Sequence, residues 1–158
     1  MLKIISGGQT GIDRMALEIA KELGIKTGGY IVKGYRTEDG CDFSLKEFGL
    51  TEMENTDYPK RTKKNIESAS GSVLFGNQQS LGSRLLIKYS TEFFYPFIIN
   101  PTSKKIVNYI NDLKQLTKDG SVILNIAGNR ASKISKEDLN KYREILKQAL
   151  IEIINDKK

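Results

Sequence analysis

The residues best suited to chemistry come directly after the first apolar segment of the chain. A glycine-rich loop follows the short run 2–5, and a helical pattern begins after it. Glycines let a backbone approach a phosphate closely, and the free amides at a helix N-terminus attract anions. The loop therefore predicts a site for a phosphate-bearing or oxyanionic small molecule, with a tight turn that binds nothing as the alternative. Its residues are Ser6, Gly7, Gly8, Gln9, Thr10 and Gly11.

The spacing of this loop matches G-x-G-x-x-G with Ser6 in the first glycine position, and no Walker P-loop pattern is present. A dinucleotide site would place an acid about 20 residues further on, to hold a ribose. The chain offers Lys33 and Arg36 there, which suit a second anionic group and disfavour ordinary NAD binding. We expect an anion on the amides of 7–11, a hydroxyl contact from Ser6 or Thr10, and closure by the basic pair.

Polar residues after the loop extend the candidate site. Asp13 and Arg14 fall in the first helical turn, where an acid either shapes the loop or is merely favoured by the helix dipole. The long polar segment 33–55 is expected to be an excursion, and such stretches are usually functional. Its start either covers a ligand, with Glu38 or Asp39 as polar partners, or is a solvated loop.

Three later segments offer further contacts. Arg61 and Asn65 share a helix face, although an exposed basic cluster usually does nothing. Two more loops follow expected strands and resemble the first in composition. Their candidate residues are Gly76, Gly82 and Ser83 in one, and Asn125, Gly128, Asn129 and Arg130 in the other.

Apolar runs and helical spacing alternate along the whole chain. Strands are expected at 2–5, 27–32, 72–75, 97–99 and 122–124, and amphipathic helices lie between and after them. This order predicts one α/β domain over 1–158, with a parallel sheet covered by helices on both faces. Ligands of such sheets bind outside the carboxyl ends of the strands, where the loops above lie.

Composition narrows the function classes. One cysteine and no histidine argue against a structural zinc site and against a histidine base. No apolar run approaches the roughly 20 residues of a membrane span, and no signal peptide precedes the first strand, so a cytoplasmic protein is expected. The net charge of +6 fits a solvated, lysine-rich surface. Nucleic acid is disfavoured because only Tyr58 accompanies the basic cluster at 60–64.

The segment Ser6-Gly7-Gly8-Gln9-Thr10-Gly11-Ile12-Asp13-Arg14 resembles the opening S-G-G-Q-T-G-[VI]-D-R of the putative molybdenum carrier family. The likeness continues through nearly the whole chain. It takes in Gly28-Gly29-Tyr30, Lys33-Gly34, Arg36 with Glu38-Asp39-Gly40, Tyr58 with Arg61-Thr62 and Asn65, and Leu124-Asn125-Ile126-Ala127-Gly128 with Arg130.

This resemblance implies a Rossmann-like three-layer sandwich, a homo-oligomer (dimer or tetramer), and binding of molybdenum cofactor or another nucleotide-like anion. The family is related to the LOG and lysine-decarboxylase-like proteins. The catalytic P-G-G-x-G-T-x-x-E signature of the LOG-type phosphoribohydrolases is absent here, which argues against that hydrolysis. A binding or carrier protein is the first hypothesis. The alternative is an enzyme that cleaves an N-glycosidic or phosphate bond, with Asp13, Glu38 or Asp39 as acid or base.

Overall fold

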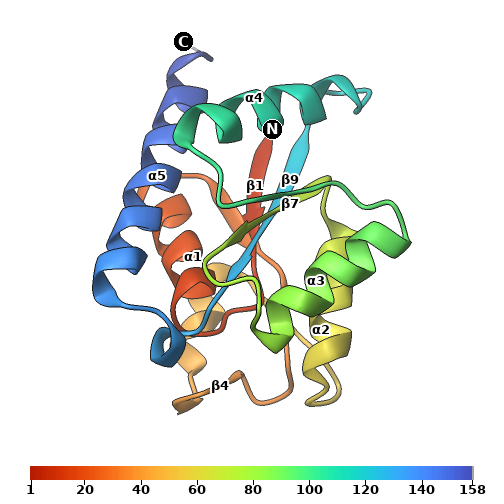
Figure 1. Cartoon of the computed structure of the whole chain (residues 1–158), viewed down its shortest axis with the longest axis vertical. Helices are drawn as coiled ribbons and strands as arrows, with labels where there is room; N and C mark the ends of the chain where they lie inside the picture. Colours follow the sequence, from red (N-terminus) through yellow and green to blue (C-terminus); the bar gives the residue numbers. More distant parts are fainter. Residues whose placement is uncertain (158) are drawn as a thin grey trace.

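The computed structural model describes residues 1–157 and has a five-stranded parallel sheet at its centre (Figure 1). The strand order is β2 (Lys26–Gly28), β1 (Leu2–Ile5), β9 (Val122–Gly128), β7 (Gly71–Phe75) and β8 (Phe97–Ile99). All neighbouring strands are paired in parallel. The parallel α/β sheet predicted from the alternating pattern is therefore confirmed.

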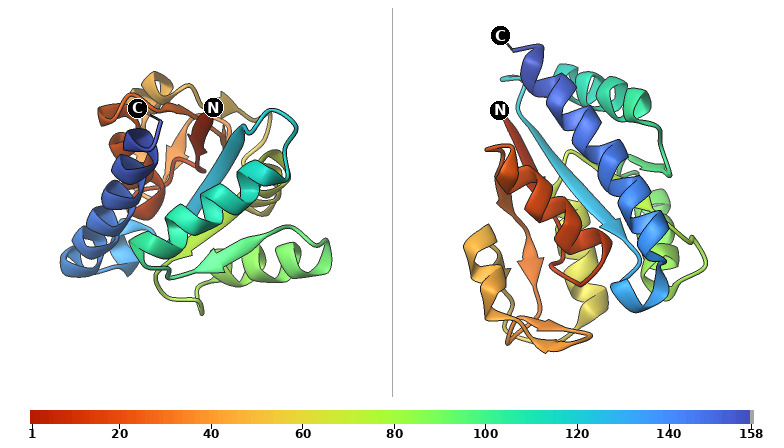
Figure 2. Two further views of the ribbon diagram at one scale, coloured as in Figure 1. Left: turned by 90° about the horizontal axis from the view of Figure 1, so that it is seen from above. Right: turned by 90° about the vertical axis from the view of Figure 1, so that its left-hand side faces the viewer.

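Helices cover both faces of the sheet and complete three layers (Figure 2). On one face, α1 (Ile12–Glu22), α4 (Ser103–Gln115) and α5 (Lys136–Asn155) enclose the main apolar core. On the other face, α2 (Tyr58–Ser68) and α3 (Leu81–Glu92) pack together around Ile66, Leu74 and Leu86. This arrangement confirms the Rossmann-like three-layer fold.

Capping residues fix where four of the helices begin. Asp57, Ser80, Thr102 and Ser135 precede α2 to α5, and each side-chain oxygen accepts a hydrogen bond from the amide three residues on. These bonds satisfy amides that the helix itself leaves without an acceptor. The caps of α2 and α3 matter for function because both helices begin beside the same cavity.

The strand expected at 27–32 is divided in two. Gly29 has a φ of +121°, and a Cβ there would collide with the carbonyl oxygen of Ser6. The chain turns at this glycine and leaves the main sheet after β2. The next strand, β3 (Tyr30–Ile31), pairs instead with β6 (Thr51–Glu52) in a small separate sheet.

The excursion 33–55 is folded rather than structureless. It contains a hairpin of β4 (Arg36–Thr37) and β5 (Gly40–Cys41), followed by the 3-10 helix η1 (Phe43–Phe48). Within it Tyr35, Leu45, Phe48 and Leu50 form a second apolar cluster against the α1 residue Leu17 and the β3 residue Ile31. The excursion therefore packs against α1 and β3 through its own apolar side chains.

No helix within residues 1–157 is both long enough and apolar enough to cross a membrane.

Candidate functional site

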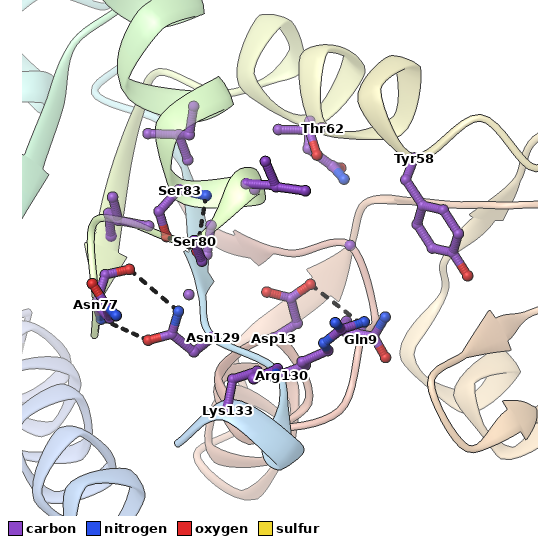
Figure 3. Close-up of a pocket in the computed structure, with 18 of the residues that line it drawn as sticks. Gln9, Asp13, Tyr58, Thr62, Asn77, Ser80, Ser83, Asn129, Arg130 and Lys133 are labelled. Atoms are coloured by element: carbon purple, nitrogen blue, oxygen red, sulfur yellow. Dashed lines mark hydrogen bonds between the residues drawn. The ribbon is translucent and has the colours of Figure 1, made fainter. Parts of the chain in front are cut away.

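A cavity of about 620 Å³ opens at the carboxyl ends of β1, β9 and β7, between α2 and α3 (Figure 3). Its volume falls within the range of small-molecule sites, roughly 300–1,000 Å³. The sheet edge is the one from which the sequence predicted ligand contacts. The cavity combines polar and charged residues with the apolar side chains Leu74, Leu81, Leu86 and Ala127.

The structure brings together about half of the residues predicted from the sequence. Those that line the cavity are Gly7, Gln9, Asp13, Arg61, Asn65, Gly82, Ser83, Asn125, Gly128, Asn129 and Arg130. Those outside it are Ser6, Gly8, Thr10, Gly11, Arg14, Lys33, Arg36, Asp39 and Gly76. The lining joins segments that are far apart in the sequence, and contact of each residue with a ligand stays a prediction.

The glycine loop differs from the expected cradle of free amides. The amide of Gly8 donates to Ser6 Oγ at 3.3 Å, that of Thr10 to Gln9 Oε1 at 3.0 Å, and that of Gln9 to Asp13 Oδ2 at 3.3 Å. The Ser6 hydroxyl is buried and donates to the backbone oxygen of Asp13 at 2.9 Å. Side chains of Ser6, Gln9 and Asp13 thus accept from three amides of the loop, so the loop offers few donors to an external anion.

Asp13 is the acid of the cavity. It is 5% exposed, and burial raises the pKa of its carboxyl from 3.8 to about 6, against the opposing effects of Arg61 and of the Gln9 and Gly7 amides. Removing a carboxylate from water disfavours its charged form. In Figure 3 the carboxylate points away from α1, toward the side of the cavity where Ser80 and Thr62 lie. Asp13 therefore changes its charge near neutral pH inside a ligand-sized space.

Arg61 is the most enclosed cation of the cavity. Its Nη1 donates to the carbonyl oxygen of Gly7 at 3.3 Å, and its guanidinium lies 5.3 Å from the ring centre of Tyr58. A Cβ on Gly7 would come within 2.7 Å of the guanidinium carbon, so the glycine makes room for Arg61. The Nε atom is buried without a hydrogen-bond partner among the described residues. Arg61 therefore retains donor capacity beside the cavity.

The structure does not place Lys33 or Arg36 over the glycine loop, and their contact with a ligand stays a prediction. Both side chains are exposed, and neither lines the cavity. The excursion contacts the loop through Glu38, whose carboxylate accepts hydrogen bonds from Thr10 Oγ1 and from the Ser132 amide. The bonds from Ser132 and Thr10 hold the pKa of Glu38 below its usual value. The hairpin is thus tied to the outside of the loop, away from the cavity.

Arg14 and Asp39 also face away from the cavity. Arg14 forms ion pairs of 2.8 Å with Glu18 on its own helix and with Asp42 at the start of the 3-10 helix. Asp39 is exposed at the tip of the β4–β5 hairpin. Arg14 therefore links α1 to the excursion rather than to the cavity.

The N-terminus of α3 forms the opposite wall from Asp13. Ser80 caps the helix by accepting from the Ser83 amide at 3.3 Å, and its hydroxyl donates to Ser83 Oγ at 2.8 Å. By helix geometry the amides of Leu81 and Gly82 have no acceptor within α3. The positive end of the helix dipole faces the same space. This loop, after β7, offers anion donors that the first loop does not.

Asparagine side chains hold the cavity floor together. Asn129 is buried, accepts from the Asn77 amide at 2.6 Å and donates to the Asn77 carbonyl oxygen at 3.3 Å. Asn125 donates to Ser72 Oγ at 3.1 Å and so links β9 to β7. Gly76 lies just outside the cavity, where a Cβ would collide with the Asn129 side chain. These bonds fix the relative position of the two strand ends that carry the site.

Sequence reasoning missed part of the lining. Ser80, Gln79, Lys133, Leu74, Leu86 and Ala127 line the cavity but were not predicted. Ser80 carried a usable signal, a serine immediately before a helical apolar run, which is typical of an N-cap. Lys133 lies at the end of the short 3-10 helix η2 (Ala131–Lys133), which follows Arg130 and brings the lysine to the cavity. The sequence carries no separate signal for this helix. The apolar wall could not be distinguished from ordinary core residues.

The donor set does not suit direct metal binding. Within residues 1–157, no three residues among His, Cys, Asp and Glu lie close enough together to hold a metal ion. The cysteine at position 41 is exposed and lies outside the cavity. The cavity itself presents Arg61, Arg130 and Lys133. These groups fit anionic oxygens rather than a bare cation.

Fold and site together define a Rossmann-like α/β protein with a small-molecule cavity at the carboxyl edge of its sheet. The chain belongs to the circularly permutated YpsA SLOG family, whose model matches residues 4–150. It is similar to a solved structure described as a putative molybdenum carrier protein from Syntrophus aciditrophicus. The two chains are 31% identical with a TM-score of 0.73, over 96% of this chain and 92% of that one. No curated protein matches the chain.

Proposed function

We propose that this protein binds or carries a phosphate-bearing or oxyanionic small molecule in the cavity between α2 and α3. The observation that carries the proposal is the convergence of three cations, Arg61, Arg130 and Lys133, with the N-terminus of α3 on one cavity. Charged hydrogen bonds from guanidinium groups and helix amides are the usual means of holding phosphate. Asp13 is the only acid among the described residues that line the cavity, so these residues carry a net positive charge in either state of Asp13.

The anion is proposed to lie against Leu81 to Ser83 and within reach of Arg61. The first loop is a poorer place, because its amides already bond to Ser6, Gln9 and Asp13. The ionised Asp13 would also repel an anion there. The first loop instead positions Asp13 and, through Gly7, Arg61.

Molybdenum cofactor and nucleotide derivatives both remain within this ligand class. Similarity to the solved structure of a putative molybdenum carrier protein favours molybdenum cofactor over a nucleotide derivative. The residues present fit the phosphate and the heterocycle of such a cofactor, since the lining offers cations, amides and an apolar wall. They would hold it without ligating its metal.

A thermal-shift titration with nucleoside monophosphates, pterin phosphates and molybdate tests the proposal. A ligand that binds only the folded state stabilises it by about 2.7 kcal/mol at 100 times its Kd. Arg61→Ala should make the binding free energy less favourable by about 1.5–3 kcal/mol, the usual value of a charged hydrogen bond, and so reduce the thermal shift. Lys105→Ala, on exposed α4 surface outside the cavity, removes the same charge as a control. No shift with any phosphorylated compound, or equal loss in both variants, would refute the proposal.

The second candidate function is hydrolysis of an N-glycosidic or phosphate bond. The observation that favours it is Asp13, whose carboxyl has a pKa of about 6 and lines the cavity. A group that titrates near the working pH is suited to general acid or base catalysis. Glu38 is held by Thr10 and Ser132, and Asp39 lies outside, so neither shares this position. Chromatography of nucleotides incubated with the protein distinguishes the two functions. Release of base or phosphate by the wild type but not by Asp13→Asn would establish an enzyme. Recovery of the intact ligand would support binding alone.

We also propose that the chain forms a homo-oligomer and works in the cytoplasm. Phe94 is 92% exposed and Phe93 is 53% exposed at the end of α3, an unusual placement for adjacent aromatic residues. Tyr89 and Tyr95 pack beside them, with ring centres 5.9 Å apart. Light scattering of the wild type and of Phe94→Ser tests this. A wild-type monomer at micromolar concentration would refute the oligomer.

A further inference from the structure

An acid and a cation that keep free hydrogen-bonding capacity both lie near Gly7. Asp13 is 5% exposed, and the chain offers its carboxylate only backbone amides, a long 3.3 Å hydrogen bond from Gln9 and the amide of Gly7. Arg61 donates to the Gly7 carbonyl, and its Nε has no partner in the described chain. The two groups form no ion pair of 4 Å or less. A buried acid without full hydrogen bonding is costly, so the site favours a ligand that donates to it.

The required ligand has two different ends. The cations and the α3 amides call for an anion, whereas Asp13 calls for hydrogen-bond donors. Between them Leu74, Leu86 and Ala127 supply an apolar surface, and Tyr58 lies at the Arg61 side of the cavity. A flat ring covers such a surface without demanding further polar partners.

Resting on the function proposed above, the geometry points to Asp13 as the residue that selects the ligand's heterocycle. We infer that its carboxylate accepts two parallel hydrogen bonds from an amidine edge, a ring N–H beside an exocyclic amino group. Guanine and pterins share this edge, while adenine, hypoxanthine and lumazine lack one or both donors on it. The two oxygens of a carboxylate can each accept one hydrogen bond from the two adjacent donors of such an edge, as they do from a guanidinium.

The remaining polar lining agrees with this orientation. Asn65 uses both ends of its amide on the Tyr30 backbone, and Asn129 uses both ends on Asn77. Neither asparagine therefore keeps both its amide donor and its amide acceptor free to bind the edge of a heterocyclic base. Asn125 donates to Ser72, which leaves its oxygen as an acceptor. Asp13 is thus the charged acceptor available to the ligand within the described lining.

Matched ligand pairs test the inference with the wild-type protein. GMP against IMP, and pterin-6-carboxylate against its lumazine analogue, each differ in the amino group that Asp13 would hold. We expect the amino compound to bind about 10- to 100-fold more tightly in at least one pair, as for a hydrogen bond to a charged group. The pair that discriminates identifies the nucleotide or the pterin as the ligand's source. Calorimetric titration gives both affinities directly.

The variant Asp13→Asn connects the discrimination to this side chain. It should reduce the preference within the discriminating pair to less than about threefold, because the amide cannot accept both donors. Asp112→Asn, on exposed α4 surface, should leave the preference unchanged. If GMP and IMP bind equally and the pterin pair does too, the inference is wrong even though phosphate binding stands. A preference that persists in Asp13→Asn overturns it as well. If no phosphorylated compound binds at all, the proposed function itself has failed.

Discussion

Replacing Asp13 with Asn should change how the stability of the protein depends on pH. Burial raises the pKa of Asp13 from 3.8 to about 6, so the folded protein holds this proton more tightly than the unfolded chain does. The cost of ionising the buried carboxyl is therefore absent below pH 3.8. It grows as the pH rises toward 6 and is constant above that. A shift of about 2 units at 1.36 kcal/mol each gives a cost of about 3 kcal/mol at pH 7.

Urea unfolding of the wild type and Asp13→Asn between pH 3.5 and 8 measures this cost. Other titrating groups act equally in both proteins, and the packing change from carboxylate to amide is independent of pH. The difference in unfolding free energy, variant minus wild type, should therefore rise by about 3 kcal/mol from pH 3.5 to 7. A flat difference would show that the carboxyl is not perturbed. A difference that falls with pH would show that Arg61 and the loop amides outweigh burial, which would refute the electrostatic account of the cavity.

Three further changes probe the structure around the site. Gly29→Ala should cost more than about 3 kcal/mol in urea unfolding, because the left-handed backbone and the Ser6 oxygen both oppose a Cβ. Gly24→Ala, with φ +72° and nothing within 4 Å, should cost only about 1–2 kcal/mol. Equal costs would show that Gly29 is not sterically constrained. Leu86→Ala should destabilise by about 2–5 kcal/mol, since Leu86 is 1% exposed in the α2–α3 cluster, and a loss below 1 kcal/mol would contradict that packing. Glu38→Gln should lower the urea midpoint at pH 7 and lower it less at pH 3.5, because the stabilisation from a depressed carboxyl pKa is lost as the pH falls. An effect that is the same at both pH values would rule out that contribution.

The sheet and its helices follow closely from local sequence signals. Apolar runs such as 72–75 and caps such as Ser135 act within a few residues, so periodicity and turn chemistry predict them. Gly29 is different, because the break in the expected strand depends on the distant Ser6 backbone. Folding of the excursion likewise depends on Leu17 of α1, which no local pattern reveals.

Half of the site could be predicted for the same reason. Strand-end loops after β1 and β9 have distinctive residues, so Gly7, Asp13 and Arg130 were found. Sequence cannot show whether the amides of the first loop are free, because an amide is free only where the chain supplies no acceptor, and here Ser6, Gln9 and Asp13 supply them. The sequence predicts Lys33 at the end of a second strand of the main sheet, whereas the chain leaves that sheet after β2 and the Lys33 side chain is exposed outside the cavity.

The most direct test of the central claim is a crystal structure of the protein with a bound phosphorylated ligand, GMP or a pterin phosphate. The account predicts the phosphate against the free amides of Leu81 and Gly82 with the Arg61 guanidinium in hydrogen-bond contact, and the ring on the Asp13 side of the cavity. A phosphate on the amides of 7–11, or only on the exposed lysines Lys60 and Lys64, would contradict it.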